Sequence, residues 1–504
     1  MRAGAVHCRS SLRAGGLASR FALVAMIAFA SAAHAQLPRV PVPAVPGVGL
    51  PGVVTDTVGR VENAAGDVAG QVDRLADVRR LRVNELVRTQ RANVERDPAG
   101  QPILRAEIVS FDPTDAALDR ARAAGFQVVR ERVLEGLDSR VVVLRAPEGM
   151  TTRRALTRMR GLDPQGSYDY NHVYLDSGSA APSLVAVGAD PPAGVRARAD
   201  ARARAGARLG AGAGAGARAS PAGSLRLALA SESGTVVAPG SAGAFKVGLV
   251  DGGVDVSHPV FKGTAIHQYG CDGKSVPSAH GTAVASLLVG KADPFAGAAP
   301  GAELFAADVY CGLGTGGAAD AVVDAIAWIA RQHVAVINVS LVGPKNVLLE
   351  NVVRLVIARG HIIVAAVGND GPAAAPLYPA SYPDVVGVTG VDAHRKVLLE
   401  ACRGKQVKFA APGADMAAAE LSPTFAVVRG TSFAAPIVAG LLAGSLHEPD
   451  REAAAKAIEA LAGQAVDLGS RGVDKTYGVG LVGDSVRSEA ALALVSASAG
   501  SGKH

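Results

Sequence analysis

The second half of the chain alternates short apolar segments rich in β-branched residues with longer helical segments. Near-continuous apolar strands that alternate with helices are typical of a parallel sheet covered by helices on both faces. The pattern predicts a doubly wound α/β domain over residues 244–490, followed by a short tail at 491–504. Functional groups of such sheets gather at the carboxyl ends of the strands. The expected strands are 247–250, 304–307, 334–339, 362–366 and 385–388, and the expected helices are 282–289, 318–330, 347–358 and 433–445.

A smaller unit precedes this domain, over residues 104–176. Alternating apolar and polar residues predict its strands, and apolar residues at helical spacing predict its helices. The order βαββαβ is that of a ferredoxin-like α+β unit. Because this fold serves many functions, the pattern alone assigns none. The expected strands are 106–111, 126–134, 140–144 and 168–175, and the expected helices are 115–124 and 151–159.

Between the two units, residues 177–243 lose all periodicity. Residues 196–218 alternate arginine with alanine and glycine, a composition typical of linkers. A structureless stretch of this length inside a compact domain would be unusual, so we expect a domain boundary here. A polyanion-binding patch is the alternative, but we favour a solvated linker that proteases can cut. The formal net charge of +6 over 504 residues is mild and does not argue for nucleic acid as a partner.

The N-terminus has the three parts of a signal peptide. Several arginines precede an apolar run at 21–32, and Ala33-His34-Ala35 follows it as a small-x-small cleavage site. We therefore expect residues 1–35 to be removed on export to the periplasm or the extracellular space. An uncleaved anchor is the alternative, although the run is short for a membrane span. No other segment has about 18 consecutive apolar residues, so no stable membrane anchor is expected.

The segment at 36–103 receives no functional assignment. Its first part, 37–53, is rich in proline and valine and reads as an extended spacer. Its second part, 54–96, carries valine and leucine at helical spacing among many charges, which would fit a helix.

Three short segments place a reactive residue at the end of an expected element. Asp251 ends an apolar strand, where a carboxylate can accept a hydrogen bond from an imidazole and fix its tautomer. His280 precedes a helix, and histidine is the natural general base near neutral pH. Ser432 opens a helix, where its backbone N–H can bind an anion. Each residue alone could simply cap a turn or a helix, but the chain order Asp, His, Ser is that of subtilisin.

The residues around these three positions resemble the signatures of the subtilase family. They are Asp251-Gly252-Gly253, His280-Gly281-Thr282-Ala283-Val284-Ala285 and Gly430-Thr431-Ser432-Phe433-Ala434-Ala435-Pro436. The family usually has Thr or Ser at 252, His at 283 and Met at 433, but these departures remove no catalytic group. The resemblance implies a serine endopeptidase that works through an acyl-enzyme, with Asp251, His280 and Ser432 as its triad and no cofactor for the chemistry. The calcium loops that family members use for structural calcium are not recognisable here.

Further segments resemble the rest of the subtilase site. The strand before Asn369 resembles the one that ends in the oxyanion asparagine. Ser340 and Leu341 resemble the strand that lines the specificity pocket, and Gly312-Leu313-Gly314 resembles the opposite strand, so substrate would add between them as a β-strand. Leu377-Tyr378-Pro379-Ala380 resembles another side of the pocket. No acidic residue is recognised there, so a neutral or apolar residue is expected before the scissile bond.

The front of the chain is also similar to that of subtilases. The unit at 104–176 resembles the family propeptide, which acts as chaperone and inhibitor and would direct its C-terminal tail toward the cleft. The mature chain would then begin between Leu175 and Phe245. Protein or peptide substrates and the chain's own propeptide are the implied partners. A maturation protease dedicated to one partner, and a catalytically silent subtilase-fold binding protein, remain as alternatives.

Three cysteines remain once the signal peptide is removed. Cys271 and Cys311 lie in expected loops near the catalytic motifs, and we expect them to pair, leaving Cys402 free. Three unpaired cysteines are the alternative. Their scatter argues against a zinc site, which would have two of them close together.

Overall fold

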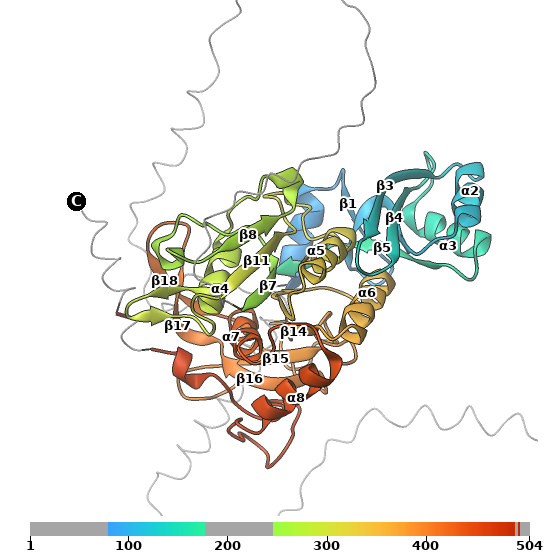
Figure 1. Cartoon of the computed structure of the whole chain (residues 1–504). Helices are drawn as coiled ribbons and strands as arrows, with labels where there is room; N and C mark the ends of the chain where they lie inside the picture. The colour runs from blue at the N-terminus through green and yellow to red at the C-terminus, as the bar shows by residue number, and fades with distance from the viewer. Residues whose placement is uncertain (1–78, 177–244, 489–491, 494–504) are drawn as a thin grey trace, which may run out of the picture. The chain divides into compact units, whose positions relative to one another are not determined.

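The computed structural model describes residues 79–176, 245–488 and 492–493 (Figure 1). The predicted signal peptide at 1–35, the Pro-rich spacer, the predicted linker at 177–243 and most of the tail lie outside the described residues. Among the described residues, no helix has the length and apolar character needed to cross a membrane.

The larger part is built on a sheet of seven parallel strands in the order β16-β15-β14-β12-β7-β11-β8. Its central strands follow the apolar segments, because each buries both of its faces. A two-stranded antiparallel hairpin, formed by β17 and β18, follows the last strand of this sheet along the chain. The bounds are β7 Lys246–Asp251, β8 Ile266–Tyr269, β11 Glu303–Asp308, β12 Val336–Val339, β14 Ile362–Ala366, β15 Val386–Val391, β16 Val407–Pro412, β17 Ala414–Ala419 and β18 Phe425–Arg429.

Helices cover both faces of this sheet, and alternate residues of one strand show it. Leu249 of β7 packs into a core with α4 and α7, whereas the next residue, Val250, packs into a second core with α5 and α6. The predicted α/β class with helices on both faces is therefore confirmed. The bounds are α4 Ala279–Val289, α5 Ala319–Arg331, α6 Val347–Ala358, α7 Thr431–Ala443 and α8 Arg451–Ala462.

The smaller part contains the predicted antiparallel α+β unit. Strand β2 pairs with β4, β5 and β1, and β4 pairs with β3. The expected last strand is divided in two: β5 stays in this sheet, and β6 leaves it. The bounds are β1 Val94–Arg96, β2 Pro102–Phe111, α2 Asp115–Ala123, β3 Gln127–Leu134, β4 Ser139–Arg145, α3 Thr152–Leu162, β5 Ser167–His172 and β6 Leu175–Asp176. A helix over residues 79–89 precedes the unit.

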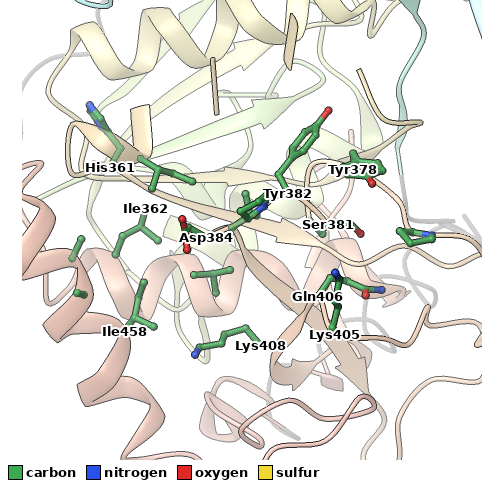
Figure 2. Close-up of a pocket in the computed structure, with 18 of the residues that line it drawn as sticks. His361, Ile362, Tyr378, Ser381, Tyr382, Asp384, Lys405, Gln406, Lys408 and Ile458 are labelled. Carbon is green, nitrogen blue, oxygen red and sulfur yellow. The ribbon is translucent and has the colours of Figure 1, made fainter. Parts of the chain in front are cut away.

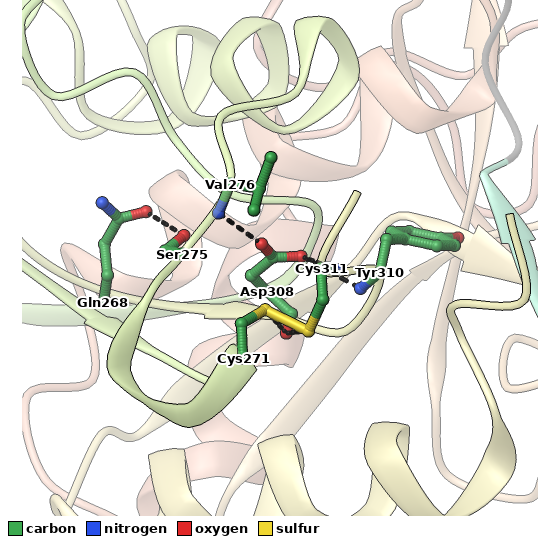
Figure 3. Close-up of a disulfide and its surroundings, with 7 residues drawn as sticks. All are labelled: Gln268, Cys271, Ser275, Val276, Asp308, Tyr310 and Cys311. Atoms are coloured by element: carbon green, nitrogen blue, oxygen red, sulfur yellow. Dashed lines mark hydrogen bonds between the residues drawn. A yellow bond between two sulfur atoms is a disulfide. The ribbon is translucent and has the colours of Figure 1, made fainter. Parts of the chain in front are cut away.

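A disulfide joins Cys271 to Cys311, which confirms the predicted pair, and Cys402 is free and buried. The two loops meet at Asp308, the last residue of β11 (Figure 3). Its carboxylate accepts hydrogen bonds of 2.9 Å from the backbone N–H groups of Val276, Tyr310 and Cys311. The disulfide and this carboxylate thus fasten together the loops that follow β8 and β11.

Replacing both Cys271 and Cys311 with serine is expected to lower the free energy of unfolding by about 4 kcal/mol. The bridge spans 40 residues, and closing a loop of that length restricts the unfolded chain by about this amount. Urea denaturation of the two proteins measures the difference. A reducing agent should shift the wild-type midpoint and leave that of the double variant unchanged; equal midpoints for oxidised wild type and variant would contradict the expectation.

Candidate active site

Asp251 and His280 meet at the carboxyl edge of the sheet. Asp251 is the last residue of β7 and only 1% exposed, and His280 lies in the first turn of α4. His280 Nδ1 lies 2.9 Å from Asp251 Oδ1. A carboxylate can only accept, so this hydrogen bond places the imidazole proton on Nδ1 and leaves Nε2 as the basic nitrogen. Nε2 is buried and has no hydrogen-bond partner within the described part of the chain.

Two glycines allow this close approach. A Cβ on Gly281 would lie 2.2 Å from the carbonyl oxygen of Gly252, and a Cβ on Gly252 would lie 2.2 Å from Ser278 Oγ. The Ser278 hydroxyl caps α4 by accepting from the Gly281 N–H at 2.9 Å. The departure from Thr or Ser at position 252 therefore has a steric reason, because Ser278 occupies the space that a side chain there would need.

Ser432 lies at the start of α7, next to the pair. The Phe433 ring packs against the His280 ring, with 5.4 Å between the ring centroids. Ser432 Oγ is 3.4 Å from the carbonyl oxygen of Ser340, to which it donates. Ser340 Oγ donates in turn to the carbonyl oxygen of Ser432 at 2.9 Å. The structure thus brings the three predicted triad residues together around the start of α7 and the segment after β12.

Asn369 is held against the same helix start. Gly368, with φ of +100°, turns the chain just after β14. Asn369 Oδ1 accepts from the Thr431 N–H at 3.1 Å, and the Gly368 N–H donates to Thr431 Oγ1 at 3.2 Å. The Asn369 side chain is therefore held against the backbone of the residue that precedes Ser432.

An extended segment of the N-terminal part occupies the groove beside Ser432. Strand β6 pairs antiparallel with β13 (Leu341–Val342), with Asp176 opposite Leu341 and Leu175 opposite Val342. On its other side, the Tyr174 N–H donates to the carbonyl oxygen of Gly317 at 2.7 Å. Residues 174–176 therefore lie between two chain segments, the strand that follows Ser340 and the backbone at Gly317.

Leu341 pairs with one side of this segment, but the predicted strand Gly312-Leu313-Gly314 does not pair with its other side. The partners of the bound segment are Gly317 and Ala318, not Gly312-Leu313-Gly314. The backbone at 310–316 is folded into turns, with Leu313 N–H bonded to Tyr310 and Gly316 N–H bonded to Leu313, and the Leu313 side chain is 62% exposed. Backbone groups used in turns cannot also pair with a strand.

Tyr174 anchors this segment in a side-chain pocket. Its side chain is fully buried, and its hydroxyl donates to the carbonyl oxygen of Pro344 at 2.8 Å. The ring lies against Gly343, where a Cβ would come within 2.4 Å of a ring carbon. Gly343 also pairs with Tyr378, so the predicted pocket segment at 377–380 does lie beside the cleft strand.

The helix at 79–89 falls within the range 54–96 where a helix was expected, but sequence reasoning missed its contacts and one acidic residue. Arg82 of this helix forms an ion pair with Asp176 of β6, and Arg79 pairs with Asp370. Asp370 directly follows Asn369, and the sequence analysis did not recognise it as an acidic residue near the predicted pocket. The run Asn369-Asp370-Gly371 reads as an ordinary turn in the sequence, and nothing local reveals its distant partner.

The described part of the molecule also contains a cavity of about 790 Å³ away from the triad (Figure 2). Its walls come from the end of α6 and the start of β14, from the segments at 376–386 and 405–408 and from α8, and include His361, Tyr382 and Asp384. None of Asp251, His280 and Ser432 lines it.

Comparison with known proteins agrees with this geometry. The Subtilase family (Peptidase S8) matches residues 243–480. Subtilisin DY of Bacillus licheniformis is 32% identical over 245 residues, which are 47% of this chain and 88% of that protein. Subtilisin E of Bacillus subtilis (strain 168) is 30% identical over 47% of this chain and 64% of its own length. The crystal structure of fervidolysin from Fervidobacterium pennivorans, a keratinolytic enzyme related to subtilisin, has the same fold (TM-score 0.56, 20% identity, 78% of this chain and 62% of that one). The chain belongs to the subtilase family of serine endopeptidases.

Proposed function

We propose that the chain is an exported serine endopeptidase, made as a precursor that processes itself, in which Asp251, His280 and Ser432 are the catalytic residues. The observation that carries the proposal is the 2.9 Å contact between His280 and Asp251 beside the start of α7. The signal-peptide pattern supports export, and the Cys271–Cys311 disulfide fits an oxidising compartment outside the cytoplasm.

The proposed reaction is hydrolysis of a peptide bond in two steps. Ser432 Oγ attacks the carbonyl carbon while His280 Nε2 takes its proton, and the tetrahedral intermediate collapses as His280 returns that proton to the leaving amine. Water then attacks the acyl-enzyme by the same route and releases the acid. Asp251 keeps the imidazole in the required tautomer and stabilises its charged form. No cofactor enters these steps.

Asn369 is proposed to stabilise the oxyanion together with the Ser432 N–H. Its amide is fixed by the Thr431 hydrogen bond, so the NH₂ group is oriented before the charge develops. Donors oriented in advance stabilise the transition state without paying for reorganisation during the reaction.

The N-terminal part is proposed to be the inhibitory propeptide. Residues 174–176 fill the cleft as an extended strand and make the backbone contacts that a substrate would make. The helix at 79–89 also takes part in this contact, because its Arg79 forms an ion pair with Asp370 and its Arg82 forms one with Asp176. Full activity then requires removal of the whole segment before the peptidase domain.

Activity should fall as the pH drops through a value above 6.5. Burial lowers the pKa of His280, and the Asp251 carboxylate raises it by charge and hydrogen bonding, with a net upward direction from 6.5. The general base must be neutral, so kcat/KM is full above this pKa and lost below it. A pH profile of kcat/KM on an uncharged peptide measures the midpoint. A midpoint below 6.5 would contradict the expected direction.

Labelling with a phosphonofluoridate tests the proposed function. The processed protein should form one adduct, on Ser432, and lose all peptidase activity in proportion to labelling. A processed protein that forms no adduct would favour the silent binding protein. Digestion of a mixed peptide library separates a general endopeptidase, which cuts many sequences, from a protease dedicated to one partner.

A further inference from the structure

Asp370 is a carboxylate placed next to the reacting centre. It directly follows Asn369, whose side chain is bonded to the start of α7. Only 19% of the Asp370 side chain is exposed. Burial raises the pKa of the Asp370 carboxyl, while the charges of Arg79 and Arg82 lower it. A carboxylate in such surroundings needs a cationic partner.

That partner in the precursor is Arg79. Its Nε lies 3.3 Å from Asp370 Oδ2, and its Nη1 lies 3.5 Å from the carbonyl oxygen of Val342. Val342 is the residue of β13 that pairs with Leu175 of β6. The guanidinium therefore sits between the acidic residue and the strand that holds the cleft-bound segment.

The residues around Asp370 do not satisfy all the hydrogen-bond donors of the Arg79 guanidinium. Its side chain is 13% exposed, and its Nη2 is buried without a hydrogen-bond partner within the described residues. It also belongs to the segment that the proposed maturation removes. Once that segment leaves, Asp370 loses the cation that lies against it in the precursor.

We propose that Asp370 selects an arginine or lysine side chain in the substrate residue before the scissile bond, and that Arg79 holds this place in the precursor. This inference rests on the proposed function. The carbonyl under attack must lie at Asn369, so the side chain of the same residue is the one within reach of the adjoining Asp370. The selection replaces the neutral or apolar preference expected from the sequence.

The chain's own sequence contains suitable substrates. The predicted linker carries several arginines separated by small residues, a composition that a protease selective for basic residues would cut repeatedly. They are Arg196, Arg198, Arg202, Arg204, Arg208 and Arg218.

Two peptides that differ at one position test the proposal. One has arginine before the scissile bond and the other has citrulline, which keeps the shape of arginine and removes its charge. The processed wild-type enzyme should cleave the arginine peptide with a kcat/KM about 10- to 100-fold higher, the range expected for hydrogen bonds between charged groups. Asp370→Asn should bring this ratio close to one, mainly by lowering kcat/KM for the arginine peptide.

Asp384→Asn is the matched control, because it removes an exposed carboxylate from the same domain, on the wall of the cavity in Figure 2. It should keep the wild-type ratio. Benzamidine inhibition of the wild-type enzyme gives a measurement that needs no variant: it should be competitive. A wild-type ratio near one, or no inhibition by benzamidine, would overturn the assignment of Asp370.

The outcomes separate this inference from the function on which it rests. Cleavage of both peptides at equal rates, with a phosphonofluoridate adduct on Ser432, would contradict the proposed selectivity but support the proposed endopeptidase activity. If neither peptide is cleaved and no adduct forms, the proposed endopeptidase activity itself is contradicted.

Discussion

Ser432→Ala is expected to leave the precursor at full length, apart from signal-peptide removal, when it is expressed without another protease. The hydroxyl is the only group in the proposed mechanism that can form the acyl-enzyme, so its loss removes covalent catalysis entirely. In subtilisin, loss of this serine costs about 10⁶-fold in kcat, and we expect a loss of at least 10⁴-fold here. Gel electrophoresis and N-terminal sequencing of the purified protein measure the processing.

Ser445→Ala is the matched control for this variant. Ser445 lies just past the end of α7, is exposed and bonds only weakly, through Oγ at 3.5 Å from the carbonyl oxygen of Leu441. It should mature at the wild-type rate. Purified wild-type enzyme added to the Ser432→Ala precursor should cut it, which shows that the variant is folded and cleavable. A correctly trimmed Ser432→Ala product formed by the pure precursor alone would exclude self-processing.

Asn369→Ala is expected to lower kcat by about 10²–10³-fold while KM changes little. That magnitude is the one measured for the oxyanion asparagine of subtilisin, a relative of this chain. The effect falls on kcat because the amide meets a full negative charge only in the transition state.

Asn369→Asp separates the donor from the acceptor role of this side chain. It keeps an oxygen for the Thr431 N–H, which Asn369 Oδ1 now binds at 3.1 Å, but it removes the NH₂ donor. We expect a loss at least as large as that of the alanine variant, because a carboxylate repels the oxyanion. Asn351→Ala, on the surface of α6, should have wild-type kinetics. A loss below about threefold for both position-369 variants, against the range above, would rule out the oxyanion role.

The proposed catalytic residues could be recognised in the sequence because their signal is local. Asp251, His280 and Ser432 each lie within a short motif, and the sheet places strand ends and helix starts at one edge. The central strands were equally clear, since burial on both faces leaves a continuous apolar run. Edge strands gave less signal: β8 (Ile266–Tyr269) carries His267 and Gln268, which an edge position tolerates.

The contacts that the sequence did not reveal join residues far apart in the chain. Arg79 and Asp370 are separated by almost 300 positions, and no periodicity links them. The same holds for the pairing of Gly317 with Tyr174. The carbonyl oxygen of Gly317 accepts from Tyr174, whereas backbone groups at 310–316 form the hydrogen bonds of turns. The departure of β6 from the α+β sheet also depends on its distant partner, β13.

The pairing of β6 with β13 has a kinetic consequence. These contacts are noncovalent, so under the proposed maturation we expect a cut in the linker to leave residues 175–176 paired with β13, and the first cut alone would release no free enzyme. Activity would appear only as the severed N-terminal part dissociates or is digested. Each molecule that opens can then destroy the blocking fragments of others, so the time course would show a lag that shortens with rising protein concentration.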